Sequence, residues 1–449
     1  MKRRVHRETV CVVGLGYMGL PTAALLANAG YMVVGYDIDA RKVDAVNAGQ
    51  VTFEEPGLSD LVARAHRSGN LRATTKIEPA DTFIVAVPTP LNERAKRSEL
   101  RYVILAAGSV AGVLKPDNLV ILESTVPPKT CERLFIPSLE SSGLKAGRDF
   151  QVAHCPERAI PGNTLHELVH NDRIVGALDE PSATATSALY RSFSKGKLFL
   201  TTLTTAESVK LMENTFRDIN IALANEFARV AEQIGINAWE AIELANRHPR
   251  VNILSPGPGV GGHCIAIDPW FLTEETDHTH LIKTAREIND SMPEHVIRRA
   301  ASLLVHLPNP TISILGVAYK ANVDDARETP ARAIAEQALS RGWTVRLHDP
   351  HVTAFELPLV PLDAALAGSD LVVLVTNHED YRVLSPTHAA SLMRTPQLLD
   401  TRNWFDHAAW RQAGFQVHIH GVGQTEPTPE VLTAHRPTVS EREPTQVGQ

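Results

Sequence analysis

The segment GVGGHCIAIDP (259–269) is the first place in the chain where residue types and spacing predict chemistry. Three glycines, Gly259, Gly261 and Gly262, precede Cys264, and Asp268 follows it four residues later. A free cysteine is most often a small buried hydrophobe, which is what we expect for Cys11 inside an apolar run. Cys264 differs because the glycines before it leave the backbone open to a ligand. We therefore predict a nucleophilic thiol beside a carboxylate.

Residues 205–235 contain no proline and no glycine before Gly235, and their apolar positions recur at helical spacing, which predicts a long helix. Lys210, Asn214 and Arg217 lie at i, i+4 and i+7 and so share one face of that helix. A polar stripe is usually a solvated face. Here apolar residues flank the stripe, and burial disfavours the charged form of a lysine, which suits a role in proton transfer or oxyanion stabilisation.

The sequence GLGYMG carries Gly14, Gly16 and Gly19 directly after the apolar run TVCVV and at the start of a predicted helix. Glycines at this spacing allow a tight turn and bring the backbone close to a pyrophosphate at the helix N-terminus. The next predicted strand (31–37) ends in Asp37, where a carboxylate can bind the ribose hydroxyls of a dinucleotide. That carboxylate repels a 2′-phosphate, so NAD is favoured over NADP; the nearby Arg41 weakens this preference slightly.

Together, a bound NAD and a nucleophilic cysteine define a possible reaction. An alcohol is oxidised to an aldehyde, the thiol traps the aldehyde as a thiohemiacetal, a second oxidation gives a thioester, and water releases an acid. This chemistry needs no metal.

Strand-like runs alternate with helical stretches at both ends of the chain, which predicts an α/β protein with two Rossmann-like parallel-sheet domains joined by a central helical domain. Further strands are predicted at 81–90 and 117–128, and again at 310–320, 343–350, 370–378 and 397–404. One helical segment is predicted at 280–305. The second unit has LGVAYK, with a single glycine, where the first has GLGYMG, so we expect it to hold a different ligand. The expected domains are 1–200, 201–305 and 306–425, followed by a disordered tail at 426–449.

The composition is that of a globular protein without a basic face. The chain has 449 residues, 43% hydrophobic and 21% charged, and a formal net charge of -7, which argues against nucleic acid as a partner. Its four cysteines contain no CxxC pair, so we expect a reduced, cytoplasmic protein. Apolar runs are too short for a transmembrane helix, and we expect no membrane association.

Over nearly all of residues 9–405 the chain resembles the nucleotide-sugar 6-dehydrogenase family. The resemblance rests on GLGYMGLP, VPTP, STVPP, KLMENTFRDINIALANE, GVGGHC with its following DP, and YKANVDDARETP. HCPERAIPG (154–162) and residues 246–271 resemble the versions found in the subfamily that oxidises UDP-N-acetyl-D-mannosamine. The resemblance implies a central dimerisation domain, a C-terminal domain for a UDP sugar, two NAD per turnover and a product used for surface polysaccharide.

The resemblance also implies roles for individual residues. The catalytic set would be Cys264 as nucleophile, Lys210 as proton donor or acceptor and oxyanion partner, Asn214 as its helper, Asp268 as acid/base and Glu157 for positioning the hydrolytic water. NAD contacts would come from Tyr17, Met18, Asp37, Thr89, Thr125 and Arg327, in addition to the glycines and Arg41. The UDP sugar would be held by Arg158, Ala159, Lys210, Asn214, Arg217, His248, Arg250, Gly261, Tyr319, Lys320 and Arg402, with His248 and Arg250 reaching across a homodimer.

The residues themselves agree with an anionic substrate, since a diphosphate in an acidic protein needs a local group of arginines and lysines. Alternatives remain open. Within the family, UDP-N-acetylglucosamine or UDP-glucose is a possible substrate. Outside it, a two-electron β-hydroxyacid dehydrogenase shares the architecture but does not need Cys264, and a non-catalytic NAD-binding regulator would need none of the catalytic residues.

Overall fold

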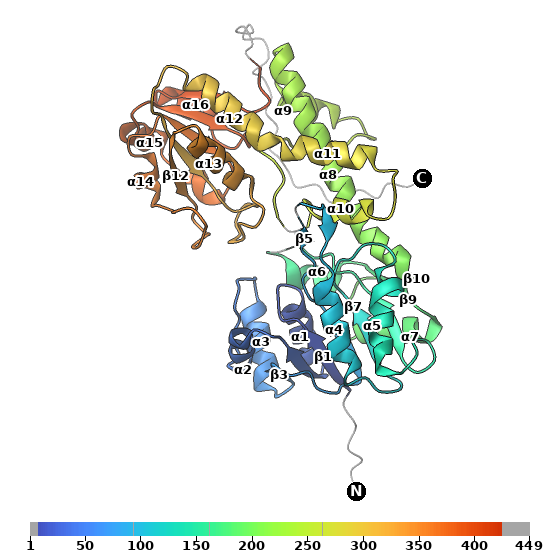
Figure 1. The fold of residues 1–449 in the computed structure, drawn as a ribbon. Helices are drawn as coiled ribbons and strands as arrows, with labels where there is room; N and C mark the ends of the chain where they lie inside the picture. Colours follow the sequence, from blue (N-terminus) through green and yellow to red (C-terminus); the bar gives the residue numbers. More distant parts are fainter. Residues whose placement is uncertain (1–7, 93, 161, 263, 424–449) are drawn as a thin grey trace.

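The structure is a computed structural model that describes residues 8–92, 94–160, 162–262 and 264–423. The predicted disordered tail, 426–449, lies outside the described residues. Two sheets lie in separate lobes, and the long helix rises from the first lobe beside the second (Figure 1). No helix in the described residues is long and apolar enough to cross a membrane.

The first sheet has eight strands in the order β10-β9-β8-β7-β4-β1-β2-β3. Their bounds are β1 (Thr9–Val13), β2 (Met32–Tyr36), β3 (Leu71–Thr74), β4 (Thr82–Val85), β7 (Leu119–Leu122), β8 (Gln151–His154), β9 (Arg173–Ala177) and β10 (Leu198–Thr202). The six strands from β3 to β8 in this order are parallel, as predicted, but β9 runs antiparallel to β8, and β10 follows the direction of β9. A hairpin of β5 (Leu91–Asn92) and β6 (Arg97–Ser98) projects from the lobe.

Helices cover both faces of this sheet. They are α1 (Gly19–Asn28), α2 (Ala40–Asn47), α3 (Leu58–Arg67), α4 (Arg101–Ala111), a π-helical turn η1 (Cys131–Phe135), α5 (Ile136–Leu139), a 3₁₀ turn η2 (Glu140–Ser142), α6 (Thr164–His170) and α7 (Glu180–Arg191). Alternate side chains of β1 enter two different cores: Val10 and Val12 pack on one side, Cys11 and Val13 on the other. This is the period of two expected for a strand buried on both faces, and it buries Cys11 completely, as predicted.

The central helices begin with α8 (Leu203–Ile234), which is 32 residues long. The Thr202 side chain caps its N-terminus, and Gly235 ends it in a left-handed conformation at φ 79°. The others are α9 (Ala238–Ala245), α10 (Asp268–Thr273), α11 (His280–Asp290) and α12 (Met292–Leu303). The single segment predicted at 280–305 is thus two helices. The break at Ser291 has a physical cause, because Pro293 lacks the N–H that a continuous helix needs and fits the first turn of α12.

The second sheet has five parallel strands in the order β12-β11-β13-β14-β15. Its elements are β11 (Thr311–Leu315), α13 (Pro330–Ser340), β12 (Thr344–His348), α14 (Leu362–Leu366), β13 (Leu371–Leu374), η3 (Glu379–Val383), α15 (Pro386–Leu392), β14 (Gln397–Asp400), α16 (His407–Gln412) and β15 (Gln416–Ile419).

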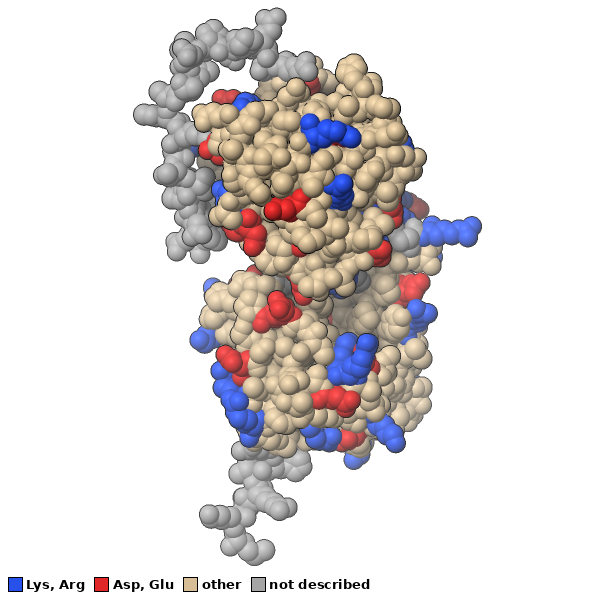
Figure 2. All heavy atoms as spheres, turned by 90° about the vertical axis from the view of Figure 1, so that its left-hand side faces the viewer, with Lys and Arg blue, Asp and Glu red and all other residues tan. Residues whose placement is uncertain are grey.

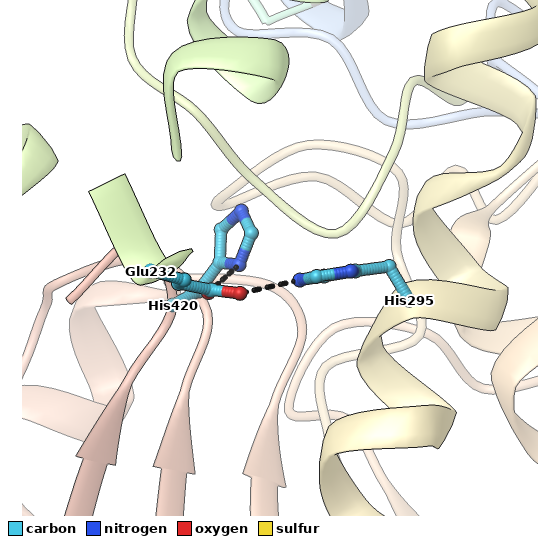
Figure 3. A group of neighbouring side chains, drawn as sticks. All are labelled: Glu232, His295 and His420. Carbon is cyan, nitrogen blue, oxygen red and sulfur yellow. Dashed lines mark hydrogen bonds and ion pairs between the residues drawn. The ribbon is translucent and has the colours of Figure 1, made fainter. Parts of the chain in front are cut away.

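One carboxylate ties this second lobe to the central helices. Glu232 of α8 accepts hydrogen bonds from His295 of α12 (2.8 Å) and from the Gly421 amide after β15 (2.8 Å), and His420 Nδ1 lies 3.2 Å from it (Figure 3). Arg299 of α12 also donates to this carboxylate. Three segments far apart in the sequence therefore converge on Glu232.

Candidate active site

Cys264 opens to the surface in the turn that leads into α10. The glycines before it pack against the second lobe: a Cβ on Gly262 would lie 2.7 Å from the Tyr319 ring, and one on Gly261 would lie 2.6 Å from the Glu328 carbonyl. The Gly262 amide also donates to the Arg327 carbonyl at 3.0 Å. The absence of side chains at Gly261 and Gly262 therefore allows the two lobes to pack together at the cysteine. From the sequence we had expected these glycines to make room for a ligand.

Two residues of the polar stripe on α8, Lys210 and Asn214, lie at this cysteine segment, whereas the third, Arg217, is exposed. Lys210, buried on α8, donates from its ammonium to the backbone carbonyl of Glu157, and Asn214 donates to Asp268 Oδ2 at 2.5 Å. Lys210 and Asn214, which the resemblance assigns to one catalytic set with Cys264, thus lie near the Cys264 segment in the structure.

The electrostatics of this group suit proton transfer. Burial raises the pKa of Asp268 to about 6, against the opposing effects of Lys210 and Asn214. Crowding by protein atoms also raises the pKa of the Cys264 thiol, although the thiol opens onto the surface, and the nearby Lys210 charge partly opposes that rise. A carboxyl group that titrates near neutral pH can both take and give a proton.

Glu157 reaches the site with its backbone, while its carboxylate points elsewhere. One oxygen accepts from the amides of Arg158 (2.7 Å) and Ala159 (2.8 Å), and the other pairs with Arg173 at 3.2 Å. Sequence reasoning missed Arg173. Its signal was a lone arginine opening an apolar strand, RIVGA, a setting in which a charge must be paired.

The dinucleotide turn has the predicted form. Gly14 adopts φ +98°, and a Cβ on it would lie 2.5 Å from the Ala86 carbonyl, whereas a Cβ on Gly19 would meet the Gly14 carbonyl at 1.9 Å. A Cβ on Gly16 would meet no protein atom within 4 Å. Gly14 and Gly19 therefore satisfy packing, and the open space at Gly16 is where a pyrophosphate can approach.

Asp37, at the end of β2, is held by the Leu15 amide at 2.8 Å. Arg41 does not approach it: its guanidinium binds Asp39 at 2.8 Å on the surface. Lys42 is the cation beside Asp37, at 3.4 Å. The cation beside Asp37 is thus Lys42 rather than the predicted Arg41.

The second sheet repeats this arrangement with a different outcome. Asp349, just after β12, accepts from the amides of Val317 (2.7 Å) and Ala318 (2.9 Å) in LGVAYK, as Asp37 does from Leu15. Here the His378 ring nitrogen Nε2 lies 3.0 Å from Asp349 Oδ2, and both side chains are fully buried. A ribose cannot reach Asp349 as it can Asp37, which agrees with a different ligand for this unit.

Arg327 connects the two halves of the site. Its guanidinium binds Asp325 at 2.6 Å and lies 5.2 Å from the centre of the Tyr17 ring in the dinucleotide turn. A cavity of about 750 Å³ lies here, lined by residues of both lobes including Tyr17, Phe53, Gly162, Asn322 and Asp325. Figure 2 shows the surface hollowed between the lobes, with charges of both signs scattered over this face.

The remaining predicted residues fall into three groups. Thr89 and Thr125 follow the carboxyl ends of β4 and β7, and the Thr89 hydroxyl donates to the Thr125 carbonyl at 2.7 Å. Met18 directly precedes α1. Tyr319 lies near Cys264, and burial raises its pKa to about 12. Exposed positions are occupied by Lys320, Arg217, His248 and Arg250.

Two further substrate candidates are already engaged by the protein. Arg158 binds Glu213 and the Asp172 carbonyl. Arg402 donates to the Val375 carbonyl at 2.8 Å and lies against Gly257, and burial lowers its pKa to about 10. Arg402 thus packs against the segment around Gly257, which precedes the Cys264 segment, and supports its shape.

Among the described residues, Glu232, His295 and His420 form a group with the ligand types of a metal site. Arg299 donates to the same carboxylate, so a metal cation would meet a fixed positive charge. We interpret the group as a tie between lobes.

The turn, the acid at the end of β2 and the polar group at Cys264 define an NAD-dependent dehydrogenase. The chain belongs to the UDP-glucose/GDP-mannose dehydrogenase family: residues 8–194 match its NAD binding domain, 204–291 its central domain and 313–407 its UDP binding domain.

Individual relatives are similar over almost their whole length. A protein of Methanococcus maripaludis (strain C7) named UDP-N-acetyl-D-mannosamine dehydrogenase is 46% identical over 93% of this chain and 97% of its own. A protein of Ralstonia nicotianae named NDP-N-acetyl-D-galactosaminuronic acid dehydrogenase is 44% identical over 88% of this chain and 96% of its own. The solved structure of the UDP-D-ManNAc dehydrogenase of Pyrococcus horikoshii superposes with a TM-score of 0.87 at 41% identity, covering 93% of this chain and 100% of that one.

Proposed function

We propose that this chain oxidises UDP-N-acetyl-D-mannosamine at C6 to UDP-N-acetyl-D-mannosaminuronate, with two NAD reduced per sugar, for surface polysaccharide synthesis. The observation that carries the proposal is the group formed by Cys264, Asp268, Asn214 and Lys210 at the junction of the lobes. The relatives named for this substrate support the choice of sugar.

The proposed mechanism uses NAD, when bound, as the acceptor of a hydride in each oxidation. Gly14, Gly16 and Gly19 would hold its pyrophosphate and Asp37 its ribose. In the first oxidation, the C6 alcohol loses a hydride and a proton, and Lys210 or Asp268 can take that proton.

The Cys264 sulfur then bonds to the aldehyde carbon, and its thiol proton passes to the new oxyanion through the same groups. Loss of a second hydride and a proton converts the thiohemiacetal to a thioester. Water adds to the thioester carbonyl, the carbon–sulfur bond breaks, and the acid leaves with the thiol restored. Lys210, held against the Glu157 carbonyl, is placed to stabilise the oxyanion in these steps.

A homodimer is the second part of the proposal. Exposed apolar side chains lie along one face of α8 at spacings of three, four or seven residues. An apolar stripe of this kind is expected to be buried against a partner. They are Met212, Phe216, Leu223, Phe227, Val230 and Ile234. His248 and Arg250, exposed beyond α9, would then enter the partner's site. We also propose domains at 1–200, 201–305 and 306–425, and a cytoplasmic location, which the four unpaired cysteines support.

The test is stoichiometry. Purified protein with NAD and UDP-N-acetylmannosamine is expected to form two NADH and one uronate per sugar. One NADH with an accumulating aldehyde would support the two-electron alternative, and no turnover with any UDP sugar would support the regulator.

The same assay with UDP-N-acetylglucosamine, UDP-glucose and UDP-N-acetylgalactosamine tests the choice of sugar. The last is included because a relative at 44% identity is named for a galactosaminuronic acid. A higher kcat/KM for any of these three would replace the proposed substrate.

A further inference from the structure

Arg173, the first residue of β9, is a charged side chain fixed deep inside the first lobe. It is 5% exposed, donates to the Leu168 carbonyl at 3.0 Å and lies over the Tyr190 ring at 4.7 Å. Its ion-pair partner is Glu157 Oε2 at 3.2 Å, and the Cys155 sulfur lies 3.9 Å from the same nitrogen. Carbonyl, ring and carboxylate therefore fix the guanidinium on three sides.

Glu157 transmits this anchoring to its own backbone. Its other oxygen, Oε1, accepts from the amides of Arg158 and Ala159, so the carboxylate is folded back onto the loop that carries it. The carbonyl of the same residue is the acceptor for the Lys210 ammonium. An unbroken path of contacts thus runs from Arg173 through the Glu157 carboxylate and the loop backbone to Lys210.

Within the described part of the chain, Arg173 is the one ion-pair partner of the Glu157 side chain. The titratable groups that influence Arg173 are Glu157, Cys155, Tyr190 and Glu123, all of them acids. Burial and the charge of Glu157 raise the pKa of Glu123 to about 7. Without Arg173, the Glu157 carboxylate would lose its ion-pair partner while it stays buried near Glu123, and we expect it to change position.

We propose that Arg173 is a positioning residue for the oxidation: by anchoring Glu157, it sets the backbone carbonyl that holds Lys210 at the cysteine site. The inference rests on the proposed function, in which Lys210 serves the reacting oxygen. Among the described residues, the contacts of the Arg173 side chain include neither the dinucleotide turn nor the Cys264 segment.

The first test needs no turnover. Lys210 lowers the pKa of Cys264, and the other charges that influence this thiol are Asp268, Arg327 and Asp325. The rate of Cys264 alkylation by iodoacetamide, followed as a function of pH by mass spectrometry of the labelled peptide, therefore reports the placement of Lys210. In Arg173→Met we expect the midpoint to rise by about half a pH unit, because a released ammonium stabilises the thiolate less.

Arg173→Lys keeps the positive charge but loses the planar guanidinium group. We therefore expect a smaller rise of the pH midpoint of alkylation in this variant. This variant also preserves the test if Arg173→Met does not fold. In a Lys210→Met background, replacing Arg173 should move the midpoint no further, since the effect passes through Lys210.

Arg286→Met is the matched control. Arg286 is an equally buried arginine paired with carboxylates, Asp218 and Asp290, in the contact of α11 with α8. Arg286→Met should lower the melting temperature, as Arg173→Met does, but should not change the pH midpoint of Cys264 alkylation. A wild-type midpoint in folded Arg173→Met and Arg173→Lys, or an equal shift in Arg286→Met, would overturn the inference.

The second test is kinetic. Arg173→Met is expected to lower kcat by about 10- to 100-fold with the KM for NAD and for the UDP sugar unchanged, because a misplaced Lys210 affects the transition state. Arg173→Lys should recover part of kcat. If wild-type protein turns over no UDP sugar, the proposed function fails and the alkylation test of Arg173 still stands; if wild type turns over and kcat is unchanged in Arg173→Met, the inference fails alone.

Discussion

The side-chain amide of Asn214 and the carboxylate of Asp268 are joined by a hydrogen bond of 2.5 Å, although they are 54 residues apart in the chain. The bond attaches α8 to the start of α10 and so fixes Lys210 and Cys264 relative to each other. Asp268 is held there in a buried site that disfavours its charge.

This relationship predicts a stability cost that depends on pH. Because burial raises the pKa of Asp268 from 3.8 to about 6, the folded state binds its proton more tightly than the unfolded state does. The stabilising contribution is complete below about pH 4 and is lost as the pH rises through 6. Asp268→Asn, which stays neutral and can still accept from Asn214, should therefore unfold with a free energy higher by on the order of 2 kcal/mol at pH 8 and unchanged near pH 4. Activity should fall at both pH values.

Asp349→Asn provides a control of opposite sign. Burial alone would raise the pKa of Asp349, but the hydrogen bond and charge of His378 outweigh burial and lower it. This variant should lose stability at pH 8 and lose less as the pH falls. Chemical denaturation at pH 4, 6 and 8 measures both variants, and an Asp268→Asn protein less stable than wild type at pH 8 would contradict the assigned cause.

Replacement of the thiol tests the proposed nucleophile. Cys264→Ser should bind NAD and the UDP sugar but form acid at least about 10³-fold more slowly, because a hydroxyl is a far weaker nucleophile than a thiolate. NADH formed per sugar should drop from two to at most one. Cys131→Ala is the matched control, since Cys131 is fully buried, and it should retain the stoichiometry of two. Full acid formation by Cys264→Ser would exclude the thioester route.

The glycines of the dinucleotide turn should separate into two kinds. Gly16→Ala adds a Cβ that meets no protein atom, so the melting temperature without ligand should stay within about 1 °C of wild type, while NAD affinity falls by roughly tenfold or more. Gly19→Ala forces a Cβ to within 1.9 Å of a backbone carbonyl and should lower the melting temperature itself. Thermal scans with and without NAD distinguish them; a large loss of stability in ligand-free Gly16→Ala would contradict the assignment.

The exposed stripe on α8 predicts the oligomeric state. Phe216→Glu places a charge in the proposed interface, at its most exposed aromatic ring, and should convert a dimer to a monomer, measured by light scattering. If His248 and Arg250 complete the partner's site, the loss of the dimer should also lower the activity. Val383→Glu is the control, since Val383 is 86% exposed on the second lobe and away from α8. A wild-type protein that is monomeric at assay concentration would remove the basis for this proposal.

Features set by local spacing could be predicted from the sequence. The glycines of the turn, Asp37 at a strand end, and the length of α8 each follow from residues close together in the chain. The pairing of α8 with the Cys264 segment was also predictable, but only from the resemblance, because no local pattern relates residues 54 positions apart.

Features set by tertiary contacts could not be predicted. The reversal of β9 depends on how the chain returns after α6, and the strands on either side of that reversal have ordinary sequences. The backbone of Glu157 contacts Lys210, yet the direction of its carboxylate depends on Arg173, which is 16 positions away. Arg41 and Lys42 are adjacent in the sequence, and only the start of α2 at Ala40 decides which of them faces Asp37.

The packing of Tyr319 against Gly261 and Gly262 makes the reaction centre indivisible. A proteolytic fragment ending before β11 would keep the dinucleotide turn, α8 and Cys264, but nothing would support the glycine backbone in front of the thiol. We therefore expect that neither half of this chain is a minimal catalyst, and that a chimera that exchanges the last lobe needs a matching aromatic ring at that contact.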